Sequence, residues 1–144
     1  MLAPGCFDLL HPGHIRLLEQ ARSLGDVVVV ALESDASVRA REAARQSGRG
    51  PKRVPLRPIT PANERAEILA ALASVDYVVE IDESSLAQFI ERLTPEIVVI
   101  GAGPGGAAAE EEAAPGVAAK IVCIPLEPGY STTSLVARIQ QLRA

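Results

Sequence analysis

Tryptophan is absent from this chain, and the other aromatic residues are scarce. Only two phenylalanines and two tyrosines occur among 144 residues, so the core must consist of Val, Ile, Leu and Ala. The two cysteines, Cys6 and Cys123, are too few for a disulfide framework, and we expect a reduced, cytoplasmic setting. No apolar run approaches the about 20 residues of a membrane span, and the first residues lack the pattern of a signal peptide.

Positive charge is also in deficit, since 14 Lys and Arg stand against 18 Asp and Glu. This balance argues against a general affinity for nucleic acid. The length and the 48% hydrophobic content predict a single domain over residues 1–144 with a substantial core. Half of the basic residues nevertheless fall between residues 39 and 57, which we interpret as a basic loop: Arg39, Arg41, Arg45, Arg49, Lys52, Arg53 and Arg57.

Four short runs rich in β-branched residues predict buried parallel strands, at residues 27–32, 77–81, 97–100 and 121–124. Continuous apolar runs are typical of strands whose two faces are both covered. A strand ahead of Gly5 could only be very short, because Met1 to Pro4 are all that precede it.

Patterns with the apolar spacing of amphipathic helices separate these strands. They begin after Gly13, at Thr60-Pro61, at a capping box formed by Ser85 and Gln88, and near Thr133. The first should end at Gly25 with Leu24 inside, and the last should bury Leu135, Val136, Ile139 and Leu142. Strands alternating with helices predict an α/β fold, a Rossmann-like doubly wound parallel sheet with helices on both faces.

The only two histidines, His11 and His14, share one turn in the spacing His-x-Gly-His. A glycine turn, the N–H groups of a helix N-terminus and two imidazoles enclose a volume suited to a polyphosphate. We expect both histidines to stabilise charge on a phosphate that undergoes substitution, and Gly13 to let the backbone approach it. The alternative is two surface histidines in an ordinary turn.

The residues just before this turn are Gly5, Cys6, Phe7 and Asp8. Gly5 should shape the turn, Phe7 should pack beneath it, and Cys6 is predicted to be a small buried packing residue. Asp8 could orient a histidine, cap the helix, approach a metal-bound phosphate, or be a plain turn residue.

Hydroxyl residues precede the last predicted helix, at Ser131, Thr132 and Thr133. Their hydroxyls and the free N–H groups of a helix start can bind phosphate oxygens, although an ordinary N-cap needs only one hydroxyl. In the basic loop, the candidates for phosphate binding are Arg39, Arg41, Lys52 and Arg53, among which the sequence does not choose.

A glycine-rich segment at residues 101–106 matches the pattern G-x-G-x-x-G after a strand. It raises a rival hypothesis, a dinucleotide-binding oxidoreductase. That fingerprint normally follows the first strand of its unit, however, and this hypothesis leaves the His-x-Gly-His turn without a role.

The chain as a whole resembles the cytidylyltransferase-like nucleotidyltransferases, and most closely the adenylyltransferase domain of ADP-heptose synthases. The matching segments lie at residues 5–14, 25–26, 33–39, 57–59, 65–69, 75–79 and 129–133. The resemblance implies transfer of AMP from ATP, or of CMP from CTP, to a phosphorylated sugar or polyol such as heptose 1-phosphate. Mg²⁺ would be bound through the nucleotide phosphates rather than by protein ligands, and a homodimer is in keeping with the family.

The same resemblance implies roles for individual residues. His11 and His14 would bind the triphosphate, Gly5, Cys6 and Phe7 would line the nucleotide pocket, and Ser131, Thr132 and Thr133 would hold phosphates. One departure stands out: the family's Lys-Gly-Gly-Asp-Tyr is replaced at residues 100–104 by Ile-Gly-Ala-Gly-Pro. Two alternatives therefore remain, a cytidylyltransferase of the glycerol-3-phosphate type and a nucleotide-binding homologue without catalysis.

Overall fold

The computed structural model describes residues 1–46, 57–102, 119–126 and 128–142. Its five strands form one parallel sheet in the order β3-β2-β1-β4-β5, which confirms the predicted fold class. The strands are β1 (Leu2–Gly5), β2 (Val29–Glu33), β3 (Tyr77–Ile81), β4 (Ile97–Ala102) and β5 (Lys120–Pro125). The very short first strand is the central one.

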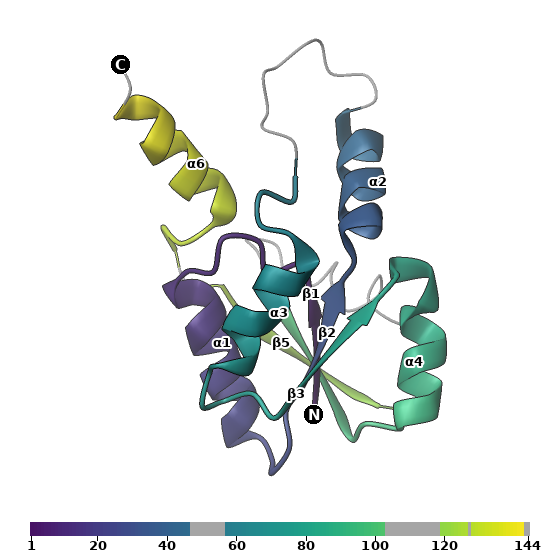
Figure 1. Ribbon diagram of the computed structural model, residues 1–144. Coiled ribbons are helices and arrows are strands. Elements are labelled where there is room, and N and C mark those ends of the chain that lie inside the picture. Colours follow the sequence, from purple (N-terminus) through teal and green to yellow (C-terminus); the bar gives the residue numbers. More distant parts are fainter. Residues whose placement is uncertain (47–56, 103–118, 127, 143–144) are drawn as a thin grey trace.

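Helices cover both faces of the sheet, as Figure 1 shows: α1 and α3 lie on one face and α4 on the other. In the described residues, none of the helices is long and apolar enough to cross a membrane. The helices are α1 (Pro12–Ser23), α2 (Asp35–Gln46), α3 (Ala62–Ala70), α4 (Leu86–Leu93) and α6 (Thr132–Gln141), with a short 3-10 turn, η1 (Glu83–Ser85), before α4.

The core consists of two aliphatic layers, one on each side of the sheet. Alternate residues of β2 point to opposite faces, so Val30 and Leu32 pack with Leu18 of α1 and Leu69 of α3. Val29 and Ala31 belong to the second layer, which includes Ile90 of α4. Continuous apolar strands are thus explained by burial on both sides.

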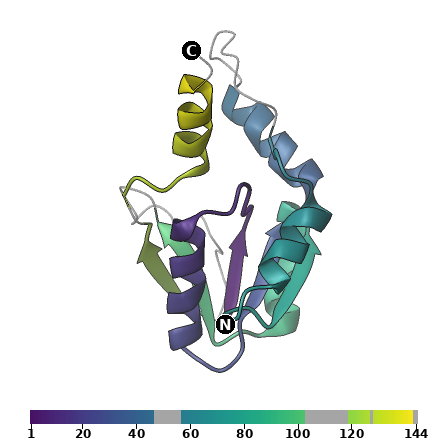
Figure 2. The same ribbon diagram turned by 60° about the vertical axis from the view of Figure 1, so that its left-hand side comes forward.

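The order of the strands switches at β1: β2 and β3 follow on one side of it, and β4 and β5 on the other. In open α/β sheets, ligands bind beyond the carboxyl ends of the strands at such a switch point. The loop that carries His11 leaves β1 at this edge. Figures 1 and 2 both show α2 and α6 extending beyond the same edge, on either side of it.

The basic segment is not a loop throughout, because residues 39–46 belong to α2. Alanines at positions 36, 40, 43 and 44 favour a helix, and Asp35 pairs with Arg39 across one turn at 3.6 Å. The prediction of a loop at residues 39–46 is therefore wrong, because the run of basic residues does not outweigh the helix propensity of these alanines. The other two phosphate-binding candidates, Lys52 and Arg53, lie outside the described residues, as do residues 103–106 of the glycine-rich segment.

Two helix starts also differ from expectation. Ser85 precedes α4, but its side chain makes no capping hydrogen bond, because η1 already supplies a turn there. Pro61 is the N-cap residue of α3, so the helix itself begins at Ala62.

The apolar side of α6 is largely exposed, in contrast to the prediction that it is buried. Leu135 and Val136 are half-buried, whereas Ile139 is 51% and Leu142 88% exposed. The reason is that α6 leaves the carboxyl edge of the sheet and does not lie across a face of it (Figure 2). Leu24, after the last turn of α1, is exposed as well.

These positions give a direct test of the packing. Leu18→Ala should lower the free energy of unfolding by about 2–5 kcal/mol, because it leaves a cavity between α1 and the sheet. Leu142→Ala, the identical substitution at the exposed C-cap residue of α6, should change it by less than about 0.5 kcal/mol. Urea unfolding followed by circular dichroism measures both, and equal losses would contradict the described packing.

Candidate active site

The two histidines face each other at the start of α1. His11 is the N-cap residue, and its carbonyl accepts hydrogen bonds from the backbone N–H groups of His14 and Ile15. The imidazole rings stack with their centroids 3.8 Å apart and their planes 17° from parallel. The ring of Phe7 lies against His14 at 5.3 Å. The structure thus brings together the residues that the sequence placed in one site.

Gly13 provides the space for this stacking. A Cβ atom at Gly13 would lie 3.0 Å from Nδ1 of His11 and 3.2 Å from Cβ of Tyr130. A side chain would therefore push against both the imidazole and the segment that leads into α6. The prediction for Gly13 concerned a close approach of phosphate, whereas the observed contacts give it a packing role.

The turn between β1 and α1 is not a glycine turn. Phe7 and Leu9 adopt the left-handed conformation, with φ angles of 49° and 50°. Gly5 instead ends β1, and a Cβ atom there would lie 2.9 Å from the ring of Phe7. Phe7 therefore packs on Gly5 as expected. Left-handed backbone at two non-glycine residues indicates strain that the surrounding contacts hold in place.

Both imidazoles are neutral at pH 7. Burial, the neighbouring His11 and the guanidinium of Arg57 together lower the pKa of His14 to about 4. Burial also lowers the pKa of His11. Within the described residues, Nδ1 of each ring is buried without a hydrogen-bond partner. Each neutral ring carries one N–H, and since both Nδ1 atoms are buried, only the Nε2 side of each ring can offer a hydrogen bond to an anion.

Asp8 connects the turn to a distant segment. Its carboxylate is buried and accepts hydrogen bonds from the backbone N–H groups of Ile59 and Thr60 and from Nε of Arg57, all within 3.1 Å. Its backbone carbonyl accepts a hydrogen bond from the hydroxyl of Thr132. Asp8 is thus an anchor for two other segments, a role that the sequence did not predict.

Burial raises the pKa of the half-buried Cys6 thiol above its ordinary value. The carbonyl of Cys6 accepts a hydrogen bond from Arg65, a fully buried residue of α3. Arg65 also donates to the carbonyl of Thr60 and pairs with Asp35 at 2.7 Å. Arg65 thereby links the turn to the start of α2.

The three hydroxyl residues at α6 have different partners. Ser131 caps the helix in a reciprocal capping box with Ser134. Thr132 is buried and bonds to Asp8. Thr133 is exposed, and its hydroxyl makes no hydrogen bond within the described part of the chain. Of the three, Thr133 is therefore the one whose hydroxyl is open to a ligand.

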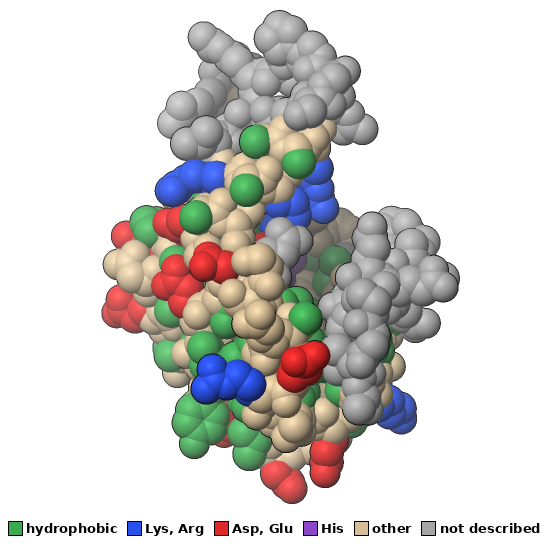
Figure 3. Space-filling view, turned by 90° about the vertical axis from the view of Figure 1, so that its right-hand side faces the viewer, with side chains coloured by type: hydrophobic (Ala, Val, Ile, Leu, Met, Phe, Trp, Pro, Cys, Tyr) green, Lys and Arg blue, Asp and Glu red, His purple; other side chains and the backbone are tan. Residues whose placement is uncertain are grey.

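The predicted cations are partly engaged. Arg39 pairs with Asp35, and Arg41 pairs with the buried Glu33. Arg57 was not among the predicted phosphate-binding residues, yet it pairs with Asp8 in the turn. The signal in the sequence is the Arg-Pro dipeptide at the end of the basic segment. In Figure 3, a histidine side chain is visible in a hollow below a group of Lys and Arg side chains.

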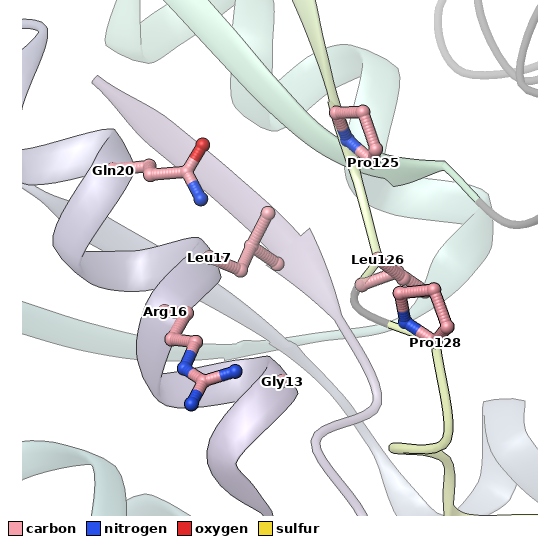
Figure 4. Close-up of a pocket in the computed structure, with 7 residues that line it drawn as sticks. All are labelled: Gly13, Arg16, Leu17, Gln20, Pro125, Leu126 and Pro128. Carbon is pink, nitrogen blue, oxygen red and sulfur yellow. The ribbon is translucent and has the colours of Figure 1, made fainter.

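A cavity of about 300 Å³ adjoins the histidine turn. It lies between α1 and the chain after β5, and its walls are mostly apolar (Figure 4). Arg16 and Gln20 supply its polar edge, and the guanidinium of Arg16 lies 5.4 Å from the centre of the Tyr130 ring. The lining residues are Gly13, Arg16, Leu17, Gln20, Pro125, Leu126 and Pro128.

Comparison with known proteins gives consistent matches along the chain. A family model described as cytidylyltransferase-like matches residues 2–138. The bifunctional protein HldE of Koribacter versatilis is 47% identical over 137 residues, and that of Rhodopseudomonas palustris strain BisB18 is 40% identical over 144 residues. These matches cover 93% and 97% of this chain. The chain spans about a quarter of the length of either relative, 26% in each case.

One similar solved structure is the lipopolysaccharide core biosynthesis protein from Thermoplasma volcanium, with a TM-score of 0.64 and 28% identity. The match covers 88% of this chain and 95% of that protein.

The depressed histidine pKa predicts a pH-dependent stability. The pKa of His14 is about 4 in the folded state, against an ordinary value of 6.5. Between these values the unfolded chain binds more protons, so the free energy of unfolding should fall as the pH drops below 6.5, by up to about 1.4 kcal/mol per pH unit. Urea unfolding at pH 7, 6 and 5 measures this slope. His14→Phe should make the slope shallower, and an unchanged slope would show that the lowered pKa of His14 is not its cause.

Proposed function

Because this chain belongs to the cytidylyltransferase-like family, we propose that it transfers a nucleoside monophosphate from a nucleoside triphosphate to the phosphate of a sugar or polyol. The observation that carries this proposal is the stacked pair His11 and His14 at the N-terminus of α1, beside the switch point of the sheet. Neutral donors and helix N–H groups at one point suit a phosphate under attack.

In this reaction, an oxygen of the acceptor phosphate attacks the α-phosphorus of the triphosphate. A new P–O bond forms as the bond to the bridging oxygen breaks, and pyrophosphate leaves with the electron pair. Negative charge develops on the non-bridging and leaving oxygens. His11 and His14 would donate hydrogen bonds to these oxygens, and removing one such donor typically lowers the rate about 10²–10³-fold.

The rest of the nucleotide would extend away from the histidines in two directions. The apolar cavity between Leu17 and Leu126 suits a nucleoside, because it is concave and has a few polar groups at its edge. Thr133 and the N-terminus of α6 would bind phosphate oxygens. The backbone of Gly5, Cys6 and Phe7 would complete the wall of the nucleotide site.

Mg²⁺ would arrive with the triphosphate as part of the substrate and neutralise charge on its phosphates. Asp8 is an acidic side chain in the turn itself, and its carboxylate is already bound by two backbone N–H groups and Arg57. In the described residues, no three His, Cys, Asp or Glu side chains are grouped so that they could hold a metal ion. The phosphates are therefore the better ligands.

The names of the similar proteins favour particular substrates. HldE proteins and a lipopolysaccharide core biosynthesis protein support AMP transfer from ATP to heptose 1-phosphate. CTP with glycerol 3-phosphate is the second pair to test, because the family description itself names cytidylyl transfer.

The first test is pyrophosphate release with Mg²⁺, over ATP, CTP, GTP and UTP against heptose 1-phosphate, glycerol 3-phosphate and other phosphorylated acceptors. We expect release with ATP and heptose 1-phosphate, and a loss of about 10²–10³-fold in His14→Ala. Full turnover in His14→Ala would overturn the role of the histidines. A chain that binds triphosphate without release for any acceptor would instead be a nucleotide-binding homologue.

The cavity has a test of its own. Gln20→Trp should fill it and raise the KM for the triphosphate at least about tenfold, which corresponds to about 1.4 kcal/mol of binding. Glu19→Trp is the matched control, since Glu19 is equally exposed on α1 but does not line the cavity. The same KM in both variants would place the nucleoside elsewhere.

A further inference from the structure

In the free protein, the histidine pair brings no positive charge to the site. Both imidazoles are neutral at pH 7, because burial lowers the pKa of each. Hydrogen bonds from neutral donors stabilise a phosphate less than charge-assisted ones do. A cation close to His14 would supply what the pair lacks.

Arg57 occupies such a position. After burial and the neighbouring His11, its positive charge is a further cause that lowers the pKa of His14, so the guanidinium lies within electrostatic reach of that ring. Nε of Arg57 donates to Asp8 at 3.1 Å, and the Asp8 carboxylate is itself held by the backbone N–H groups of Ile59 and Thr60. The side chain of Arg57 is 19% exposed. The guanidinium is thus held by Asp8 through Nε, while part of the side chain remains exposed to solvent.

The terminal nitrogens of Arg57 are available to a ligand. Within the described residues, Nη1 and Nη2 make no hydrogen bond, and neither is a buried unpartnered atom. A guanidinium held through Nε presents its two terminal groups in a fixed plane, which matches two oxygens of a phosphate.

Three other described arginines pair with carboxylates, and Arg16, at the edge of the cavity, lies over the ring of Tyr130. Arg65 is fully buried and bonded to Cys6, Thr60 and Asp35. Arg41 pairs with Glu33 and Arg39 with Asp35.

We propose that Arg57 is a catalytic residue that binds, beside His14, the phosphate undergoing substitution. This inference rests on the proposed function. Arg57 contributes the fixed positive charge, the histidines contribute directional hydrogen bonds, and Asp8 holds the guanidinium in the orientation that the phosphate needs. As charge builds on the oxygens in the transition state, the contacts to Arg57 strengthen, which raises kcat more than it lowers KM.

The test compares Arg57→Gln and Arg57→Lys with Arg92→Gln, which removes an exposed arginine from the last turn of α4, just before β4 and at the opposite edge of the sheet. Each variant is assayed for kcat and KM with the triphosphate, for binding of ATP and of CTP by calorimetry, and for thermal unfolding. We expect kcat to fall about 10²–10³-fold in Arg57→Gln. Arg92→Gln should match the wild type.

Arg57→Lys separates catalysis from structure. Lysine keeps the charge beside Asp8 but cannot bond Asp8 and grip two phosphate oxygens together. We therefore expect a folded protein with kcat still reduced at least about tenfold. If both Arg57 variants unfold at lower temperature but keep the wild-type kcat, Arg57 is only a structural partner of Asp8 and the proposal is wrong.

Failure of the proposed function would look different. A wild-type chain that binds ATP or CTP but releases no pyrophosphate with any acceptor would overturn the proposed reaction. Weaker triphosphate binding in Arg57→Gln would then still support Arg57 as a phosphate-binding residue, and equal triphosphate binding in wild type and variant would overturn that role as well.

Discussion

The site depends on the buried carboxylate of Asp8. A carboxylate that is removed from water needs hydrogen bonds from the protein in its place. Nε of Arg57 and the backbone N–H groups of Ile59 and Thr60 provide them. The backbone carbonyl of the same residue holds Thr132 at the start of α6. One residue thereby fixes the histidine turn, the segment before α3 and the entry to α6 relative to one another. None of these three segments lies in the sheet, so strand pairing alone could not place them.

The close stacking of His11 and His14 determines the charge of the pair. Stacked rings 3.8 Å apart, with Gly13 leaving no Cβ atom in the way, are too close for both to be charged. Burial acts in the same direction. In the free protein the site therefore presents two uncharged imidazoles at the start of α1 and a separate cation, Arg57, held by Asp8.

The sequence predicted the sheet better than it predicted the site. The predicted strand at residues 77–81 is observed as Tyr77–Ile81, and the others differ by one or two residues at their ends, because apolar runs report burial directly. The helix over residues 39–46 was missed, and α6 was wrongly placed on the core. Apolar spacing shows that a helix has an apolar side but not what covers it.

The histidine pair was predictable because its members are three residues apart at a helix start. The link from Asp8 to Arg57 spans 49 residues and the link from Asp8 to Thr132 spans 124. A single sequence contains no local pattern for contacts of that range. The roles of Ser131, Thr132 and Thr133 could not be predicted from the sequence either. Only the structure shows that Ser131 caps α6 and Thr132 bonds to Asp8, whereas Thr133 is exposed.

The absence of tryptophan gives the molecule an optical consequence. Its ultraviolet emission comes from two tyrosines alone. Tyr77 lies on the edge strand β3, far across the sheet from β5, and is 63% exposed. Tyr130 lies beside Gly13 and under the guanidinium of Arg16, and both of these residues line the cavity. One of the chain's two tyrosines is therefore next to the cavity, where its emission reports on Arg16 and Gly13 without an added label.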